Sequence, residues 1–191
     1  LYKRGAGEAV IVSACTYSGH TFVDGGTLRV NGALSASAAL VRAGGTLAGS
    51  GTLARTVNVE GGTLAPGAAA GQPGALTLGR HLRLAAGGTL RIGISATGHG
   101  KAVLTNSDAR VLLADAALEV ELLPGGGAAL SAPLTIIDNQ GSNLIEGAFA
   151  GLPEGGAFTA SGRTFKITYL GGDGNDVALT SSARGTLFSV Q

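Results

Sequence analysis

The stretch with the clearest potential for chemistry is GGDGNDVAL, at residues 171–179. It fits the nonapeptide G-G-x-G-x-D-x-U-x, whose acidic, glycine-rich turns hold calcium between stacked β-coils. Each such ion needs two consecutive nonapeptides, but neither the preceding GRTFKITYL nor the following TSSARGTLF fits. Asp173 and Asp176 with nearby carbonyls would supply fewer oxygens than the roughly 6 to 8 that calcium takes. We therefore expect no metal site, keep Asp173 and Asp176 as the calcium candidates, and expect a Gly-Asp-Asn turn that closes the last strand.

Two other patterns with a known chemistry are present only in part. GSGTLA, at residues 49–54, matches the loose dinucleotide fingerprint G-x-G-x-x-A, but no helical pattern follows it, so we interpret its glycines as turn residues. The histidines are His20, His81 and His99. His81 and His99 could lie near each other on adjacent coils with Asp108 in reach, yet neither G-x-S-x-G nor H-E-x-x-H is present. We expect no catalytic residue among them.

The chain also lacks the residues needed for acid–base cleavage of polysaccharides. Polysaccharide lyases and hydrolases built on β-coils need clustered carboxylates and basic groups on one sheet. Between residues 9 and 101 the carboxylates are Asp24 and Glu60 alone. We therefore expect that the chain is not an enzyme and holds no cofactor.

The composition favours one packed, β-rich domain. Of 191 residues, 34 are glycine, which suits many tight turns and is hardly tolerable in helices. With 45% hydrophobic and 13% charged residues, the chain is too apolar to be disordered. Aromatic residues make up 4% of the sequence, so the core must be aliphatic. Cys15 is the only cysteine, and no internal disulfide can form.

Charge and the N-terminal segment exclude further classes. The net charge is +1, and although residues 1–101 are net basic and residues 102–191 net acidic, basic and aromatic residues do not alternate as nucleic-acid binding requires. In LYKRGAGEAVIVSAC, Glu8 interrupts the apolar run, so we expect a β-strand and not a signal or lipidation segment. The chain starts at Leu1 and contains no methionine, so we expect a fragment or processed form.

An internal repeat gives the strongest signal. GGTL begins at residues 25, 44, 61 and 87, and a degenerate copy, SGTL, begins at residue 50. Alternating runs follow each GG, as in TLRV and TLRI, with a period of two that is typical of strands. Other segments alternate too, including TVNVE, ALTLG, HLRLA and LEVEL.

The repeat predicts a parallel β-helix. Equivalent residues of successive coils lie about 4.8 Å apart and stack in ladders. We expect one interior ladder, with the threonine before each leucine pointing outward; its members are Leu28, Leu47, Leu64 and Leu90. The longest interval between repeats predicts a loop at PGAAAGQPG, residues 66–74.

After about residue 100 the pattern loosens into longer strands. FTASGRTF predicts an antiparallel hairpin through Ser161-Gly162. Aromatic residues also gather in this half, namely Phe149, Phe158, Phe165, Tyr169 and Phe188. A hairpin with aromatic cover would close the core and protect the last edge. We divide the chain into coils at 1–100, a C-terminal end and cap at 101–180, and a tail at 181–191.

The order of these motifs resembles a known family. GAGEAVIVSACTYSGHTFVDGGTLRVNGAL, followed by GGTLAGSGTL, VNVEGGTLAPG and GALTLGRHLRLAAGGTLRI, resembles the passenger-associated repeat of bacterial autotransporters, the pertactin-like type V secreted proteins. FAGLPEGGAFTASGRTFKITYLGGDGNDVALT is similar to the C-terminal end of the same passenger β-helix. The resemblance covers about residues 3–180; Cys15 departs from the family pattern.

This resemblance implies an all-β fold, a right-handed parallel β-helix with a C-terminal hairpin-containing cap. It also implies secretion through the outer membrane of a Gram-negative bacterium by a C-terminal translocator barrel, and a location at the cell surface or beyond. We expect a non-catalytic stalk with an autochaperone-like role, whose partner is that barrel. Two alternatives stay open: an adhesin that binds host proteins or matrix through loops 66–74 and 124–133, and the scaffold of a passenger with an enzymatic domain upstream. Nucleic acid is not an expected partner.

Overall fold

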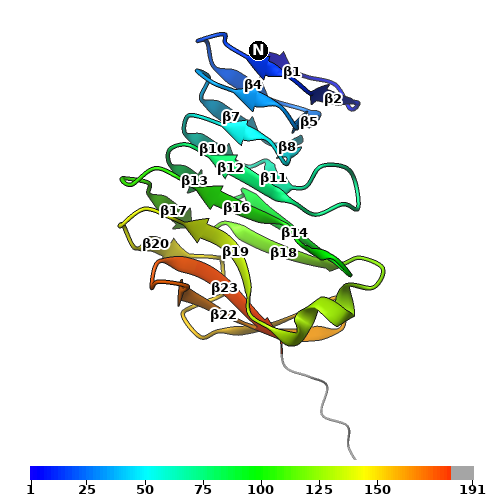
Figure 1. Cartoon of the computed structure of the whole chain (residues 1–191), viewed down its shortest axis with the longest axis vertical. Coiled ribbons are helices and arrows are strands. Elements are labelled where there is room, and N and C mark those ends of the chain that lie inside the picture. Colours follow the sequence, from blue (N-terminus) through cyan, green and yellow to red (C-terminus); the bar gives the residue numbers. More distant parts are fainter. Residues whose placement is uncertain (182–191) are drawn as a thin grey trace, which may run out of the picture.

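The computed structural model describes residues 1–181 and has an all-β fold (Figure 1), as the sequence predicts. The described residues contain no α-helix; the one helical element is a short 3-10 helix, η1, at Gly126–Ser131. No helix among them has the length and apolar character needed to cross a membrane. The predicted tail at 181–191 lies outside the described residues apart from Ser181, as does Phe188.

The strands of residues 1–181 form three sheets. Sheet A consists of β1 (Tyr2–Lys3), β4 (Thr21–Val23), β7 (Ala39–Arg42), β10 (Val57–Glu60), β13 (Leu82–Leu84), β17 (Val111–Ala114) and β20 (Ile145–Ala148). Sheet B consists of β2 (Glu8–Ile11), β5 (Gly26–Val30), β8 (Gly45–Gly49), β11 (Thr63–Pro66), β14 (Thr89–Ser95), β15 (Gly98–His99) and β18 (Ala117–Leu122). Sheet C consists of β3 (Ala14–Cys15), β6 (Ala33–Leu34), β9 (Thr52–Leu53), β12 (Ala75–Leu78), β16 (Lys101–Leu104), β19 (Leu134–Asn139), β21 (Ala157–Ala160), β22 (Arg163–Gly171) and β23 (Asp176–Ser181).

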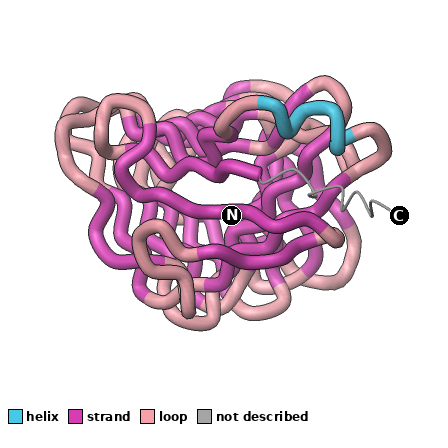
Figure 2. Tube along the Cα trace, turned by 90° about the horizontal axis from the view of Figure 1, so that it is seen from below, coloured by secondary structure: helices cyan, strands magenta, loops and turns pink. Residues whose placement is uncertain are grey.

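The chain visits the sheets in a fixed order. It passes from A to B to C and back to A, so that β4, β5 and β6 make one coil and β7, β8 and β9 lie beside them as the next. Neighbouring strands of successive coils are parallel, and this pairing continues past residue 100 as far as β20. Figure 2, which looks along the stack, shows strands forming the sides of a flattened cross-section and loops at its corners.

Identical side chains stack in sheet B as the GGTL spacing predicts. Leu28 pairs in register with Leu47, Leu47 with Leu64, and Leu64 with Leu90. All four are at most 1% exposed, and burying each stabilises the fold by about 1.5–3 kcal/mol. The threonines that precede them stack in the same register and stay half-buried on the outer face.

The two glycines perform different tasks in the repeats that begin at residues 44, 61 and 87. Gly61 has a φ of 85°, in the left-handed region that costs other residues roughly 1–2 kcal/mol. Gly62 instead allows close approach of the preceding coil, since a Cβ there would lie 2.5 Å from the carbonyl oxygen of Arg42. Asp115, with a φ of 53°, occupies the place of the first glycine in the coil that contains β18. Asparagine and aspartate tolerate this conformation better than most residues, so this coil carries Asp-Ala-Ala-Leu in place of GGTL.

The degenerate copy SGTL does not belong to the ladder of sheet B. Its Thr52 and Leu53 form β9 in sheet C. Leu53 stacks on Leu34 and Leu78 in a second interior ladder. The sequence could not separate the two ladders because both follow a glycine turn with Thr-Leu and alternate with the same period.

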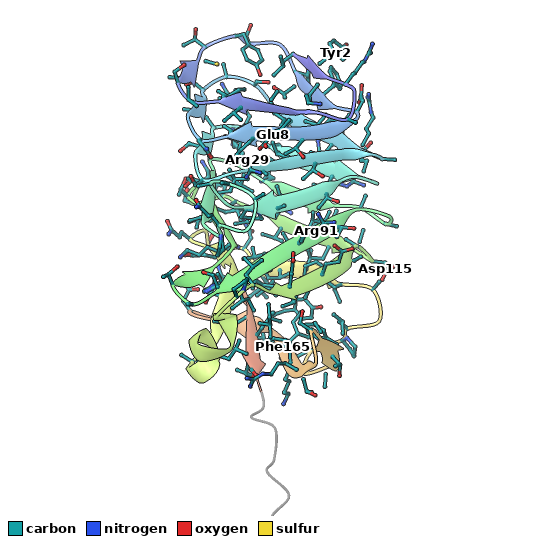
Figure 3. All side chains as sticks on the ribbon, turned by 90° about the vertical axis from the view of Figure 1, so that its right-hand side faces the viewer. Tyr2, Glu8, Arg29, Arg91, Asp115 and Phe165 are labelled. Carbon is teal, nitrogen blue, oxygen red and sulfur yellow. The ribbon has the colours of Figure 1, made fainter. Side chains whose placement is uncertain are left out.

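The C-terminal end is closed by antiparallel strands. β23 pairs antiparallel with β19 of the last coil, and β22 and β21 add to it in turn (Figure 1). β21 and β22 form the predicted hairpin, with φ of 48° at Ser161 and 72° at Gly162. Phe165 and Phe149 are buried at this end, and Figure 3 shows Phe165 in its lower part. We call β21, β22 and β23 the cap.

Candidate functional site

The motif GGDGNDVAL forms the expected turn between two strands of the cap. Gly171 ends β22 and pairs with Asp176, which begins β23. Asp173 lies exposed in the turn, whereas Asp176 is 8% exposed and its Oδ1 accepts a hydrogen bond of 2.8 Å from the backbone amide of Asn139. The two candidate calcium ligands therefore differ in role, because only Asp173 is free of a structural hydrogen bond within residues 1–181.

The surroundings of Asp176 disfavour its charge. Burial raises the pKa of the Asp176 carboxyl above its usual value, and the carboxylates of Asp138 and Asp173 raise it further. The hydrogen bond from Asn139 and the charge of Lys101 act in the opposite direction. A cation at Asp176 would also have to compete with the amide of Asn139 for the same carboxyl oxygen.

A network of amide side chains occupies the same corner of the fold. The side-chain Nδ2 of Asn175 donates to the carbonyl of Gly141 at 2.5 Å, and that of Asn139 donates to Asn143 at 2.7 Å. Within residues 1–181 no three histidine, cysteine, aspartate or glutamate side chains are grouped so that they could hold a metal ion. The network therefore joins the cap to the last coil by hydrogen bonds.

The partial dinucleotide fingerprint occupies a turn between strands. Gly49 and Gly51 lie where the chain passes from β8 to β9, and a strand follows them, not a helix. A Cβ at Gly51 would run into the carbonyl of Gly32 in the preceding coil. These glycines permit coil stacking, and no helix N-terminus is present there to receive a phosphate.

His81 and His99 lie at different corners of the fold. His81 lies where the chain passes from sheet C to sheet A, and its Nδ1 accepts a hydrogen bond of 3.2 Å from the amide of Arg110. His99 lies in β15, between sheets B and C, with its Nε2 2.8 Å from the carbonyl oxygen of Thr135. Asp108 is exposed, and its amide bonds to Asn106. The structure does not bring these residues together.

A buried arginine on the outer face of sheet B was missed in the sequence. Arg29 is 8% exposed, its Nε forms an ion pair with Glu8, and its Nη1 donates to the carbonyl of Gly67 at 2.6 Å. Glu8 and Arg29 lie next to each other on this face, with Arg91 further along it (Figure 3). In the sequence Arg29 is visible only as a charged residue at an outward position of the strand TLRV, because its partner Gly67 lies 38 residues away.

The anchored loop forms a hollow of about 280 Å³. The predicted loop occupies the segment between β11 and β12, and Asn31 Nδ2 donates to Ala68 at 2.9 Å as a second anchor. Thr27, Arg91 and Glu121 line the hollow below it. Its mixed polar surface suits hydrogen bonding to a partner and offers no nucleophile with an adjacent base.

The cap is held by a tyrosine that bonds to two backbone groups. Tyr169 Oη donates to the carbonyl of Leu152 at 2.6 Å and accepts from the amide of Phe149 at 3.0 Å. Burial raises the pKa of the Tyr169 hydroxyl above its usual value; the hydrogen bond from the Phe149 amide lowers this pKa, and the charge of Glu154 raises it further.

The other end of the stack carries exposed apolar residues on or beside its edge strands, namely Leu1, Tyr2, Val10 and Val12.

Comparison of the sequence with family models and with curated proteins gives no match.

Proposed function

We propose that this chain is the non-catalytic C-terminal stalk of an autotransporter passenger, built as a right-handed parallel β-helix and displayed at the bacterial surface through its own translocator barrel. The observation that carries the proposal is the asymmetry of the stack. The coils end at a bonded antiparallel cap on the C-terminal side, while β1, β2 and β3 remain edge strands on the other.

This asymmetry supports an autochaperone-like role. In a one-dimensional stack, stability is the sum of each coil's own stability and its interfaces with neighbours. The cap joins β22 and β23 to β19 and adds buried aromatic residues, so it is the part best able to fold without a neighbouring coil. Later coils would then add to a preformed edge, each burying an aliphatic ladder.

A matched pair of substitutions tests this order of folding. Leu179 in β23 and Leu34 in β6 are both 0% exposed in sheet C, and each Leu→Ala change costs about 2–5 kcal/mol. We expect Leu179→Ala to slow refolding and Leu34→Ala mainly to speed unfolding, because only the first weakens the nucleus. Stopped-flow refolding of the whole chain measures both rates.

Hydrogen exchange gives an independent measurement. The slowest amides should lie after residue 100, with protection decreasing towards residue 1. If the slow amides lay in the GGTL coils, or if Leu34→Ala were the substitution that slowed refolding, the autochaperone role would lose its physical basis.

The anchored loop favours one second function, binding of a host protein. Arg29 and Asn31 hold residues 67–68 against sheet B, and Ala69, Ala70, Gly71 and Gln72 are exposed beyond them. A fixed loop binds with less entropic cost than a mobile one. Replacing residues 69–72 with Gly-Ser-Gly-Ser should abolish adhesion of the chain to host cells without lowering its melting temperature; unchanged adhesion would exclude the loop.

A further inference from the structure

Two shallow hollows meet at the corner where the chain passes from sheet C to sheet A. One, of about 420 Å³, is lined by residues of four successive turns, including His20, Arg55, Thr56, Arg80 and His81. The other, of about 250 Å³, includes Thr56, His81, Arg83 and Arg110. Because Thr56 and His81 belong to both, the hollows form one continuous surface, which we call the basic groove.

Three arginines of the basic groove, Arg55, Arg80 and Arg83, differ from most other cations of the described residues because they have no partner. Six cationic side chains take part in ion pairs: Arg4, Arg29, Arg42, Arg91, Lys101 and Arg110. In contrast, Arg55, Arg80 and Arg83 are exposed and form neither an ion pair nor a side-chain hydrogen bond within residues 1–181. Among the described residues outside the groove, Lys166 of the cap is likewise exposed and unpaired, and Arg163 is unpaired but half-buried.

Coil stacking sets these cations in a row. Each of three neighbouring strands in sheet A has an arginine within the two residues before it. These are Arg55 before β10, Arg80 before β13 and Arg110 before β17. Neighbouring strands lie about 4.8 Å apart, so the positive charges follow the long axis of the molecule at short spacing. Arg83 adds to the row from an outward position of β13, between Asn58 and Leu112. Glu146 is the one acidic residue in the lining, and it pairs with Arg110.

The groove also contains polar, uncharged side chains that can form hydrogen bonds with hydroxyl groups of a ligand. Thr56, Asn58 and His81 lie between the arginines. His81 accepts from the Arg110 amide at Nδ1, so in its neutral form the proton is on Nε2 and available to a ligand. Guanidinium groups bind sulfate and carboxylate in a bidentate manner.

The aromatic residues near the groove offer no platform for bases. Tyr2 and Phe22 stack on each other with centroids 4.7 Å apart. Arg4 lies over the Tyr2 ring and Arg42 over the Phe22 ring, each at 4.9 Å. Single-stranded nucleic acid depends on open aromatic faces for stacking, whereas these two rings already stack on each other and each carries an arginine.

We propose that the basic groove binds a linear anionic polysaccharide, with sulfate or carboxylate groups paired to Arg55, Arg80 and Arg83 and sugar hydroxyls hydrogen-bonded to Thr56, Asn58 and His81. This interaction does not depend on the stalk proposal, because it follows from the side chains of one corner.

Titration calorimetry of the whole chain with a heparin octasaccharide tests the proposal. The triple variant Arg55→Gln, Arg80→Gln, Arg83→Gln should weaken binding at least about tenfold, since it removes three charge-assisted hydrogen-bond donors from the groove. The control Arg4→Gln, Arg91→Gln, Lys166→Gln removes the same charge from other faces and should change affinity by less than about threefold. All six side chains are exposed, and melting curves verify that both variants fold.

Three outcomes would overturn the proposal. Absence of heparin binding by the unmodified chain would exclude the ligand class. Equal losses of heparin affinity in the two triple variants would show that binding depends on net charge alone and not on the groove. Binding of a single-stranded DNA of equal charge as tightly as heparin, with the same loss in the groove variant, would make nucleic acid the partner instead.

Discussion

The backbone amide of Asn139 donates a hydrogen bond to Oδ1 of Asp176 over 2.8 Å and so joins the last parallel strand of sheet C to the turn of the cap. A residue that first suggested a calcium ligand thus serves a structural contact. The contact also places a carboxyl in a buried position next to Asp138 and Asp173, where ionisation is disfavoured.

The stability of the chain should therefore depend on pH through Asp176. Because its pKa in the folded state lies above the unfolded value of about 3.9, its favourable contribution is complete below that value and is lost as pH rises through the folded pKa. Asp176→Asn keeps a side-chain oxygen for Asn139 and removes the charge. Its melting temperature relative to the unmodified chain should rise between pH 3.5 and 7. Asp108→Asn, an exposed control, should show no such trend, and parallel curves for Asp176→Asn would contradict the assignment.

Charge placed inside the coil should be far more damaging than charge placed outside. Leu47 is 0% exposed, whereas its neighbour Thr46 is half-buried on the outer face. We expect Leu47→Asp to unfold the chain at ambient temperature because an isolated buried carboxylate has no partner. Thr46→Asp should cost no more than about 1 kcal/mol. Circular dichroism melting of both variants measures the difference, and similar destabilisation would reverse the inward and outward assignment.

Chelation of divalent metals should leave stability unchanged. Asp173 is exposed and Asp176 is bonded to Asn139, so a calcium ion would find too few oxygen ligands. The melting temperature should be the same with and without EDTA. A fall of several degrees that calcium alone restores would make Asp173 and Asp176 ligands after all, since a ligand that binds the folded state stabilises it.

The second glycine of a repeat should tolerate no side chain. In Gly62→Ala the new methyl would lie 2.5 Å from the Arg42 carbonyl oxygen and 2.6 Å from Cγ1 of Val41, so the coils must separate, at a cost of about 1–3 kcal/mol. Gly7→Ala is the matched control, because no atom lies within 4 Å of a Cβ there. Urea unfolding of both variants decides the point; equal midpoints would show that coil spacing is not limited by Gly62.

The sequence by itself determined the local rules of this fold. Alternation with a period of two placed Leu28 and Leu47 inside and Thr27 and Thr46 outside, and the glycine pairs marked the turns. The hairpin at Ser161-Gly162 was equally predictable, because its turn requires positive φ at two adjacent residues. These features depend on residues close in sequence or on a repeat, so their physical causes are visible in the chain.

The tertiary structure alone decided which distant residues meet. Three contacts depend on the number of residues in each turn, because that number sets the position of every coil. They are the pairing of SGTL in sheet C, the hydrogen bond from Arg29 to the carbonyl of Gly67, and the meeting of Arg55 and Arg80 in one groove. Local alternation fixes the face on which a side chain lies, but not the strand beside it. That neighbour depends on register across coils of unequal length, and register is chosen by the summed packing of the whole core.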